Sequence, residues 1–364
     1  MVNKLVVENL KHRPIRTFLT LAAIGLQVTM ILTLVGVSDG TIEDSARRTR
    51  GIGADILVRP PASSAVGLSS APIPQKLLPV LQRQPHVALV TGTVEHSTGG
   101  LLERVTGVDF DALKRMSGGL KFLEGRLPES DNEIVVDDFY ARQHKLHAGS
   151  AYKLINSNWI VSGVFESGKG SRVFMRLGVL QDKIANPDKL SVIYVKADDP
   201  KNIPIVLDEL KKLLPDNPIF TLEEFLSQIS ADSVELVKSF TRVVIGLSVV
   251  FGFLVVFLAM YTAVLERTRE IGILKALGAS PAYIVSILMR ETIILGLVGS
   301  VVGILLTYGT RFVIMSFPAS LTQKIVPEWW PIATAIALVG AILGALYPGL
   351  KAARQDAIEA LTYE

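Results

Sequence analysis

The chain has 364 residues, of which 49% are hydrophobic and 20% are charged, with a mean hydropathy of +0.41 and a formal net charge of +3. The hydropathy is high for a soluble globule, yet there are too many charges for a protein made only of membrane spans, so the residues must divide between lipid and water. The small net charge does not favour binding to nucleic acid, and the absence of cysteine excludes disulfide bridges and thiolate metal sites.

The first two segments suit a membrane surface and a membrane interior. Residues 1–16 are predicted to form an amphipathic cytoplasmic helix, because Leu5 and Leu10 share one side and Lys4 lies elsewhere. Residues 17–37 carry no charge and are long enough to cross the hydrocarbon core as the first span. This run is longer than a signal core, and no small-x-small cleavage site follows it. We therefore expect it to remain as an anchor.

Residues 38–242 separate the first span from the second, and no run within them reaches spanning length. We predict an extracytoplasmic α+β domain that is held together by its own apolar core. Residues 38–50 and 222–242 are compatible with helix and continue directly into spans, so we predict that they form stalks. Short strands are predicted at residues 55–58, 87–94, 104–108, 133–136, 151–155, 159–165, 172–176 and 190–196, and helices at residues 138–145, 179–184 and 204–214.

A segment rich in proline, glycine and serine lies early in this domain. Residues 60–74 contain Pro60, Pro61, Pro72 and Pro74, which predicts a mobile loop outside the core. Such a loop could touch cargo or a partner, or it could be a solvated excursion without a task.

One stretch partly matches a nucleotide-binding loop. Gly163, Gly168 and Lys169 fit the start of GxxxxGK[ST], but Gly170 stands where a magnesium-binding hydroxyl is required. A strand is expected after it, where a helix N-terminus should cradle phosphate. We therefore predict a hairpin turn at residues 166–171, joining two strands.

The remaining enzyme-like patterns are weak. Ser117 to Gly119 resemble part of an ABC signature loop, but no Walker B strand accompanies them, so a turn is predicted. His144 and His147 have ligand-like spacing without an HExxH pattern, which favours a surface pair at a helix end. The neighbouring carboxylates Asp137 and Asp138, like Glu223 and Glu224, fit solvated helix starts better than acid and base catalysis. The chain is therefore predicted to have no catalytic site.

Three further apolar runs complete a set of four predicted spans. They cover residues 243–265, 283–310 and 330–348, joined by a connector at residues 266–282 and a loop at residues 311–329, with a tail at residues 349–364. Basic residues precede the first span, populate the connector and follow the last span. The positive-inside bias therefore places both termini and the connector in the cytoplasm, and the loop outside. The central part of each span is uncharged, which argues against an ion-coupled transporter.

The connector has the pattern of a short amphipathic helix. Ile271, Leu274 and Leu277 recur at i, i+3 and i+6 and are predicted to form one apolar edge. This pattern is typical of a helix that docks in a protein groove. An ordinary connector lying on the lipid surface is the alternative.

Charged residues and residues that end or begin a helix complete the pattern of the connector. Arg267, Glu270 and Lys275 are predicted to offer charge to an aqueous partner, and the mixture of signs suits a protein groove better than anionic lipid. Gly278 can end the helix, and Pro281 lies where the next helix can begin.

Small residues recur at four-residue spacing in the last two spans. Gly299 with Gly303, and Gly340 with Gly344, allow helices to approach closely. The contacts they serve could lie within one chain or across a dimer.

Taken together, these segments resemble the permeases of the FtsX/MacB superfamily, the type VII ABC transporters. The resemblance rests on ENLKHRPIRTFLTLAAIGLQV near the start, on ERTREIGILKALGAS in the connector, on LMRETIILGLVGSVVG after it and on YPGLKAARQDAIEAL near the end. The order of these motifs and the size of the insert also fit, and the chain departs from the pattern at residues 356–358. With four spans, it is most similar to the haem-exporter and DevC-like branches.

The resemblance implies a polytopic α-helical membrane protein with a MacB-like periplasmic core domain, in a bacterial inner membrane. Two copies would bind two cytoplasmic ABC ATPase subunits, which would carry the ATP and magnesium. A membrane-fusion adaptor is a further possible partner, besides membrane lipids. The resemblance assigns the coupling helix to Glu266, Arg267, Thr268, Arg269, Glu270, Ile271, Gly272, Lys275, Ala276, Leu277, Gly278 and Ala279.

Three functions follow as expectations. The first is a permease that couples ATP hydrolysis by a separate subunit to extracytoplasmic movement, called mechanotransmission, and exports an amphipathic or hydrophobic compound. The second is a transducer that moves no solute and activates an external hydrolase. The third is a membrane-bound ligand receptor without ATP coupling.

Overall fold

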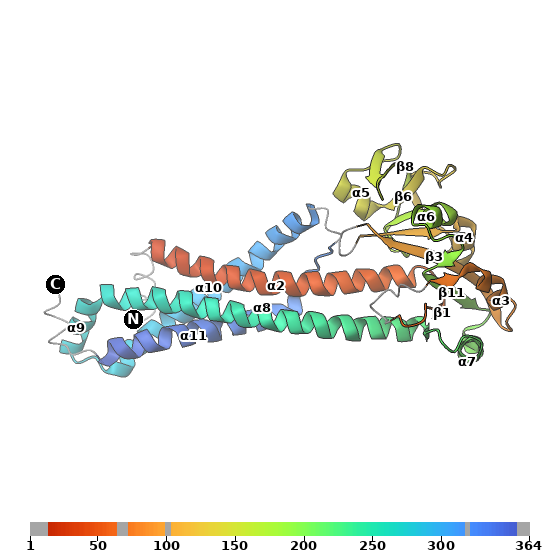
Figure 1. The fold of residues 1–364 in the computed structure, drawn as a ribbon. Coiled ribbons are helices and arrows are strands. Elements are labelled where there is room, and N and C mark those ends of the chain that lie inside the picture. The colour runs from red at the N-terminus through yellow and green to blue at the C-terminus, as the bar shows by residue number, and fades with distance from the viewer. Residues whose placement is uncertain (1–13, 64–71, 99–102, 317–320, 355–364) are drawn as a thin grey trace. The chain divides into compact units, whose positions relative to one another are not determined.

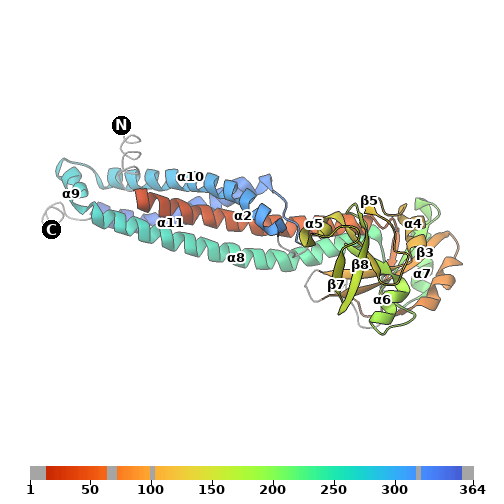
Figure 2. The ribbon, with the colours of Figure 1, turned by 90° about the horizontal axis from the view of Figure 1, so that it is seen from above.

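The structure is a computed structural model that describes residues 14–63, 72–98, 103–316 and 321–354. Its described residues form two compact units. The helical unit comprises the described residues up to Asp39, Lys238–Val313 and those from Gln323 onward, and the α/β unit comprises Gly40–Val237 and Ile314–Thr322. Figures 1 and 2 show the long helices of the first and the sheet of the second. The predicted fold class, a membrane protein with a large α+β domain inserted after its first span, is confirmed.

A mixed sheet of ten strands forms the centre of the α/β unit. The order is β12-β1-β11-β3-β4-β9-β6-β8-β5, with β7 also paired to β8, and β10 pairs with β2 apart from it. The strands are β1 (Ile56–Val58), β2 (Ile73–Pro74), β3 (Val87–Ser97), β4 (Arg104–Val108), β5 (Phe122–Gly125), β6 (Glu133–Asp137), β7 (Ala151–Leu154), β8 (Ser157–Phe165), β9 (Val173–Arg176), β10 (Lys189–Leu190), β11 (Val192–Ala197) and β12 (Ile219–Thr221).

Five helices accompany the sheet. They are α3 (Leu78–Gln82), α4 (Phe110–Ser117), α5 (Asp138–His144), α6 (Leu177–Lys183) and α7 (Ile203–Leu213). Asp109 caps α4 by accepting two backbone amides, and Asp137 caps α5 by accepting the amide of Tyr140 at 2.7 Å. Side chains such as Trp159 and Ile193 are buried in the main apolar cluster. The unit therefore has a core of its own, as expected for a chain without cysteine.

Most of the predicted strands and helices of this unit are present, with small shifts at their ends. The prediction missed β2, β5, β12, α3 and α4. Each of these has at most eight residues, too few for a clear hydrophobic period. The predicted loop at residues 60–74 falls partly outside the described residues. At its end Ile73 is buried in the core and belongs to β2, so the loop is shorter than predicted.

The predicted hairpin at residues 166–171 is wrong. Strands β8 and β9 are consecutive in the chain, but β6 lies between them, parallel to β8 and antiparallel to β9. The connecting segment therefore passes from one strand to another that is not its neighbour. A local turn signal identifies a change of direction but cannot show which strands become neighbours.

Asp137 differs from the solvated helix start that was predicted. Its side chain is fully buried, and its Oδ2 lies 3.7 Å from Nη1 of Arg172. Burial raises the pKa of Asp137 to about 6, although Arg172 and the amide of Tyr140 act in the opposite direction. The other predicted helix start, at Glu224, is exposed and forms a capping box with Thr221.

The raised pKa of Asp137 makes the stability of the α/β unit depend on pH. Because the folded state holds this proton more tightly than the unfolded state, the stabilisation is fully present below about pH 4 and is lost as the pH rises through 6. At roughly 1.4 kcal/mol per pKa unit, we expect the free energy of unfolding to fall by about 3 kcal/mol across this window, relative to Asp137→Asn.

Urea unfolding of the full chain, followed by the fluorescence of buried Trp159, measures this effect. Trp329 and Trp330 are replaced by Phe in both proteins so that Trp159 alone reports. A difference between the two proteins that stays constant from pH 4 to pH 7 would contradict the raised pKa.

Four long helices make up most of the helical unit. They are α2 (Pro14–Arg50), α8 (Leu222–Glu266), α10 (Pro281–Ser316) and α11 (Trp330–Arg354), and each contains a segment long and apolar enough to cross a membrane. As predicted for stalks, α2 and α8 each continue without a break from the apolar segment into the α/β unit. The predicted loop at residues 311–329 is shorter than expected, because α10 continues to Ser316. Most of the predicted N-terminal helix and most of the tail lie outside the described residues.

Candidate coupling site

The predicted connector contains one short helix, α9 (Thr268–Ala276). It follows a break at Arg267, and the hydroxyl of Thr268 donates to the carbonyls of Val264 and Leu265 at the end of α8. The helix has nine residues, so it is shorter than the predicted connector at residues 266–282. In Figures 1 and 2 α9 lies at the end of the long helices.

Local sequence defines the end of α9. Gly278 has a φ of +94°, which suits glycine, and its amide donates to Lys275 O, while the amide of Ala279 donates to Leu274 O. These two bonds form a Schellman motif. Helix α10 then begins at Pro281. The end of α9 and the start of α10 therefore follow from local sequence, as predicted.

An ion pair buried within the helical unit fixes the start of α9. Nη1 of Arg267 lies 3.3 Å from Oε2 of Glu291 on α10, and the two side chains are 8% and 1% exposed. The prediction that Arg267 faces an aqueous partner is therefore wrong. No local pattern signals this pair, because its members are 24 residues apart and Glu291 belongs to another helix.

A second polar contact fixes the other end of α9. Nζ of Lys275 donates to the carbonyl oxygen of Ala353 on α11 at 3.0 Å, and Lys275 is half-buried. The ammonium group of Lys275 thus has a partner within the chain, and its predicted contact with a partner protein stays a prediction. Together with the Arg267 pair, this contact ties the two ends of α9 to two different helices.

The exposed side of α9 has mixed chemistry. Arg269 and Glu270 are exposed, Ile273 is 45% exposed and Leu277 is 81% exposed, with the small Ala276 between them. We call these five residues the α9 face. The face offers one charge of each sign and two large apolar side chains, with no nucleophile or metal ligand set. It can bind a complementary protein groove, but it supplies no catalytic chemistry.

The predicted apolar edge is not a single surface. Ile271 is buried against the helical unit, Leu274 is half-buried and Leu277 is exposed. Each step of three residues turns through about 300°, about 60° short of a full turn, so Leu277 lies about 120° around the helix from Ile271. Ile273, which the pattern did not select, belongs to the exposed side instead. Of the other assigned residues, Glu266 and Gly278 are exposed, Thr268 and Gly272 are buried, and Ala279 is half-buried.

The predicted packing glycines lie at contacts within the chain. A Cβ added at Gly299 would lie 2.9 Å from Cβ of Ile24 on α2, and one added at Gly303 would lie 2.6 Å from Gly25 O. A Cβ at Gly344 would lie 2.7 Å from Phe253 O on α8, whereas one at Gly340 meets nothing nearer than 3.7 Å. Three of the four positions therefore bring helix backbones together inside one protomer.

The partial nucleotide-loop match is not followed by a helix. Gly163 lies within β8, and the strand β9 follows the glycine-rich segment. Nζ of Lys169, which would bind phosphate, donates instead to Ser117 O at 2.6 Å. Ser117 and Gly118 form the end of α4, where Gly118 has a φ of +79°, so the predicted turn there is confirmed.

The histidine pair separates in the structure. His144 is mostly covered, with its side chain 14% exposed; its ring stacks on Tyr140 with centroids 4.2 Å apart, and Nδ1 lies 3.1 Å from the hydroxyl of Tyr152. His147 is exposed and lies beside Glu124. Within the described ranges, no cluster of three or more metal-binding side chains is found.

Two family models match the chain and together cover both units. The MacB-like periplasmic core domain matches residues 17–213, and the C-terminal domain of FtsX-like permeases matches residues 242–357. The second match contains α9, α10, α11 and the part of α8 from residue 242 onward.

The individual relatives have low sequence identity to this chain. The macrolide export ATP-binding/permease protein MacB of Burkholderia cenocepacia is 28% identical, over 96% of this chain and 56% of that protein. An uncharacterized ABC transporter permease of Methanocaldococcus jannaschii is 25% identical, over 68% of this chain and 66% of that protein. The matched regions thus span between about half and two thirds of these relatives. The crystal structure of the periplasmic region of MacB from Actinobacillus actinomycetemcomitans is 18% identical, covers 50% of this chain and 95% of that one, and has a TM-score of 0.38.

Proposed function

The chain belongs to the MacB-like and FtsX-like family of ABC transporter permeases, and from that premise we propose that it couples ATP hydrolysis by a separate cytoplasmic subunit to movement of the α/β unit. The movement exports an amphipathic or hydrophobic compound. The chain itself hydrolyses no ATP, and the partner holds ATP and magnesium. Two copies of the chain work with two ATPase subunits, and an adaptor protein continues the path where the envelope has a second membrane.

The observation that carries this proposal is that one side of α9 is bound to the helical unit and the other side is exposed. Its ends are held to α10 and α11 through Arg267 and Lys275, while Arg269, Glu270 and Leu277 point away from the helical unit. A helix that is fixed on one side and open on the other can receive a push from a bound protein and pass it to the helices that hold it. The α9 face combines polar and apolar groups, as surfaces that bind other proteins do.

The orientation of the helices supports a cytoplasmic partner. Arg269 and Lys275 lie between the second and third candidate spans, Arg290 lies in the first part of the third, and Lys351 and Arg354 lie at the end of the fourth. Positive residues concentrate on the cytoplasmic side of inner membranes. The α9 face and both termini then lie in the cytoplasm, where ATP is available.

Charge reversal on the α9 face tests this function. Arg269→Glu combined with Glu270→Arg keeps the net charge and inverts its arrangement, so complementary contacts become repulsive. We expect the full chain to insert normally and to lose about 90% of the ATP hydrolysis that depends on it, equivalent to roughly 1.4 kcal/mol of binding. The measurement is co-purification of the ATPase together with its hydrolysis rate.

The matched control reverses an exposed pair elsewhere. Asp208 and Lys212 on α7 form an exposed ion pair at 2.6 Å, and exchanging these two residues should leave ATP hydrolysis unchanged. If the α9 variant also hydrolysed ATP at the wild-type rate, the docking role of α9 would be refuted.

A further inference from the structure

The segment between β8 and β9 packs on the end of α2 inside the α/β unit. We call Ser167–Ser171 the strap. The amide of Gly170 donates to Arg48 O at 2.8 Å, one of the last carbonyls of the helix, which lack partners in the helix itself. Gly168 O lies so close to Gly51 that a Cβ there would overlap it. The strap thus caps α2, and its backbone lies directly against the backbone of Gly51.

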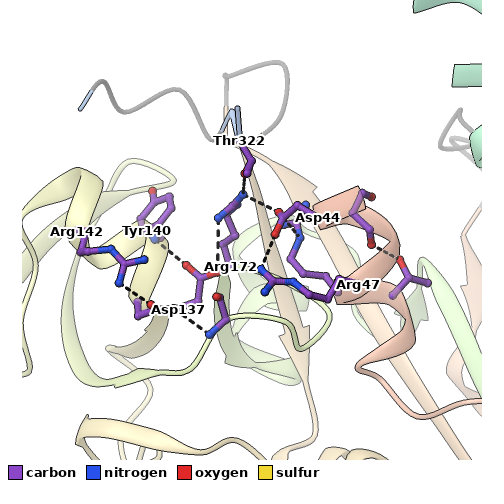
Figure 3. Close-up of polar contacts among 12 residues, drawn as sticks. Asp44, Arg47, Asp137, Tyr140, Arg142, Arg172 and Thr322 are labelled. Carbon is purple, nitrogen blue, oxygen red and sulfur yellow. Dashed lines mark hydrogen bonds and ion pairs between the residues drawn. The ribbon is translucent and has the colours of Figure 1, made fainter. Parts of the chain in front are cut away.

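Directly after the strap, Arg172 connects three segments of the unit. Its Nη2 lies 2.8 Å from Oδ2 of Asp44 on α2 and 3.4 Å from Oγ1 of Thr322, and its Nη1 lies 3.7 Å from Oδ2 of Asp137 at the start of α5. Its Cζ lies 3.9 Å from the centre of the Phe139 ring. Figure 3 shows Arg172 between Asp44 and Asp137, with Thr322 on a third side. The side chain is only 5% exposed, so water screens these interactions weakly.

Asp44 is the residue on α2 that binds Arg172. Its Oδ1 lies 3.0 Å from Nη2 of Arg47, and its Oδ2 lies 3.2 Å from Nε of Arg48. Among residues 41–50, all of which the structure describes, Asp44 alone has a buried side chain. The one buried side chain of this part of α2 is therefore polar and contacts Arg172. Charge-assisted hydrogen bonds from a planar guanidinium fix direction as well as distance, whereas apolar contacts can slide.

We propose that Arg172 and the strap form the joint through which displacement of α2 is passed to the α/β sheet, with Arg172 as the positioning residue. The inference rests on the proposed function, which supplies the displacement. Helix α2 is continuous from Pro14 to Arg50, so a force along it reaches Asp44 without a hinge. Arg172 adjoins β9, which pairs with β4 and β6 near the middle of the sheet. Load at Arg172 is therefore received by the centre of the sheet and not by an edge.

The test compares Arg172→Ala with Arg176→Ala in the full chain, bound to the ATPase that co-purifies with it. Arg176 lies on β9, is 42% exposed and pairs with the exposed Asp131. Amide hydrogen exchange is measured with and without ATP. In Arg172→Ala we expect strap amides to exchange about tenfold faster without ATP. We also expect the change that ATP induces in exchange across the α/β unit to fall by at least half, with ATP hydrolysis unchanged. Arg176→Ala should behave as the wild type.

A cross-linked variant distinguishes loss of the joint from misfolding of the α/β unit. The sequence contains no cysteine, so in Asp44→Cys/Arg172→Cys a short bis-maleimide can join only these two positions. Bridging should restore the response to ATP. A full response in Arg172→Ala, or no recovery after bridging, would overturn the inference alone. A wild-type complex in which ATP changes nothing in the α/β unit would overturn the proposed function, and this inference with it.

Discussion

Gly344→Leu is expected to disrupt the helical unit, whereas Gly340→Ala is expected to be tolerated. Even the first side-chain atom at Gly344 would lie 2.7 Å from Phe253 O and 3.1 Å from Phe257 N. Both are backbone atoms of α8, so they cannot rotate away, and the two helices must separate. Overpacking costs about 1–3 kcal/mol where side chains can adjust, and we expect at least the upper value here.

Gly340 provides the matched control, because it lies one helical turn away on α11. A Cβ there would meet Val249 O at 3.7 Å, an ordinary contact, and alanine also favours helix by about 1 kcal/mol. The measurement is the fraction of detergent-solubilised full chain that stays monodisperse during heating. Equal thermal midpoints for the two variants would show that α8 and α11 are not in close contact at Gly344.

Glu291→Ala is expected to release α9 from the helical unit. It leaves the guanidinium of Arg267 buried, without the carboxylate at 3.3 Å, and breaking a buried pair typically costs about 3–5 kcal/mol. Amide exchange in α9 should rise with the loss of this contact. If the proposed function holds, ATP hydrolysis by the bound ATPase should then be uncoupled from movement of the α/β unit.

Two further variants show whether charge burial is the cause. The double variant Arg267→Met/Glu291→Leu replaces the pair by apolar side chains and should recover most of the lost thermal stability. Arg269→Met changes a neighbouring arginine that is exposed, and should affect the stability little. If Glu291→Ala were as stable as Arg269→Met, the buried pair would not be what holds α9.

Sequence patterns located the short helix α9 but not its buried and exposed faces. The apolar runs on either side, the glycine at 278 and the proline at 281 all act within a few residues, so they define where α9 starts and ends. Which side of α9 is covered depends on Glu291 and Ala353, which belong to other helices. A nine-residue helix has too few turns for its period to reveal that side, so the pattern wrongly predicts that Arg267 is exposed.

A similar limit applies to the α/β unit. The alternation of apolar residues predicted most strands, because each strand buries one or both of its faces. The order of the strands is not predictable in this way, and the turn residues after β8 wrongly predict a hairpin. Arg172 and Asp44 lie 128 residues apart, and neither has a local pattern that marks it as part of a buried ion pair.

By itself, the sequence determined that this protein has four apolar helices, an inserted α+β domain and a short helix between the second and third candidate spans. These features depend on hydrophobicity, helix propensity and turn chemistry, which act over short stretches of chain. Only the tertiary structure decided which charges are buried together, which side of α9 remains open and which glycines meet a neighbouring backbone. Those outcomes depend on contacts between segments distant in sequence. A charged side chain that is buried by such contacts must be paired, because an unpaired buried charge is costly.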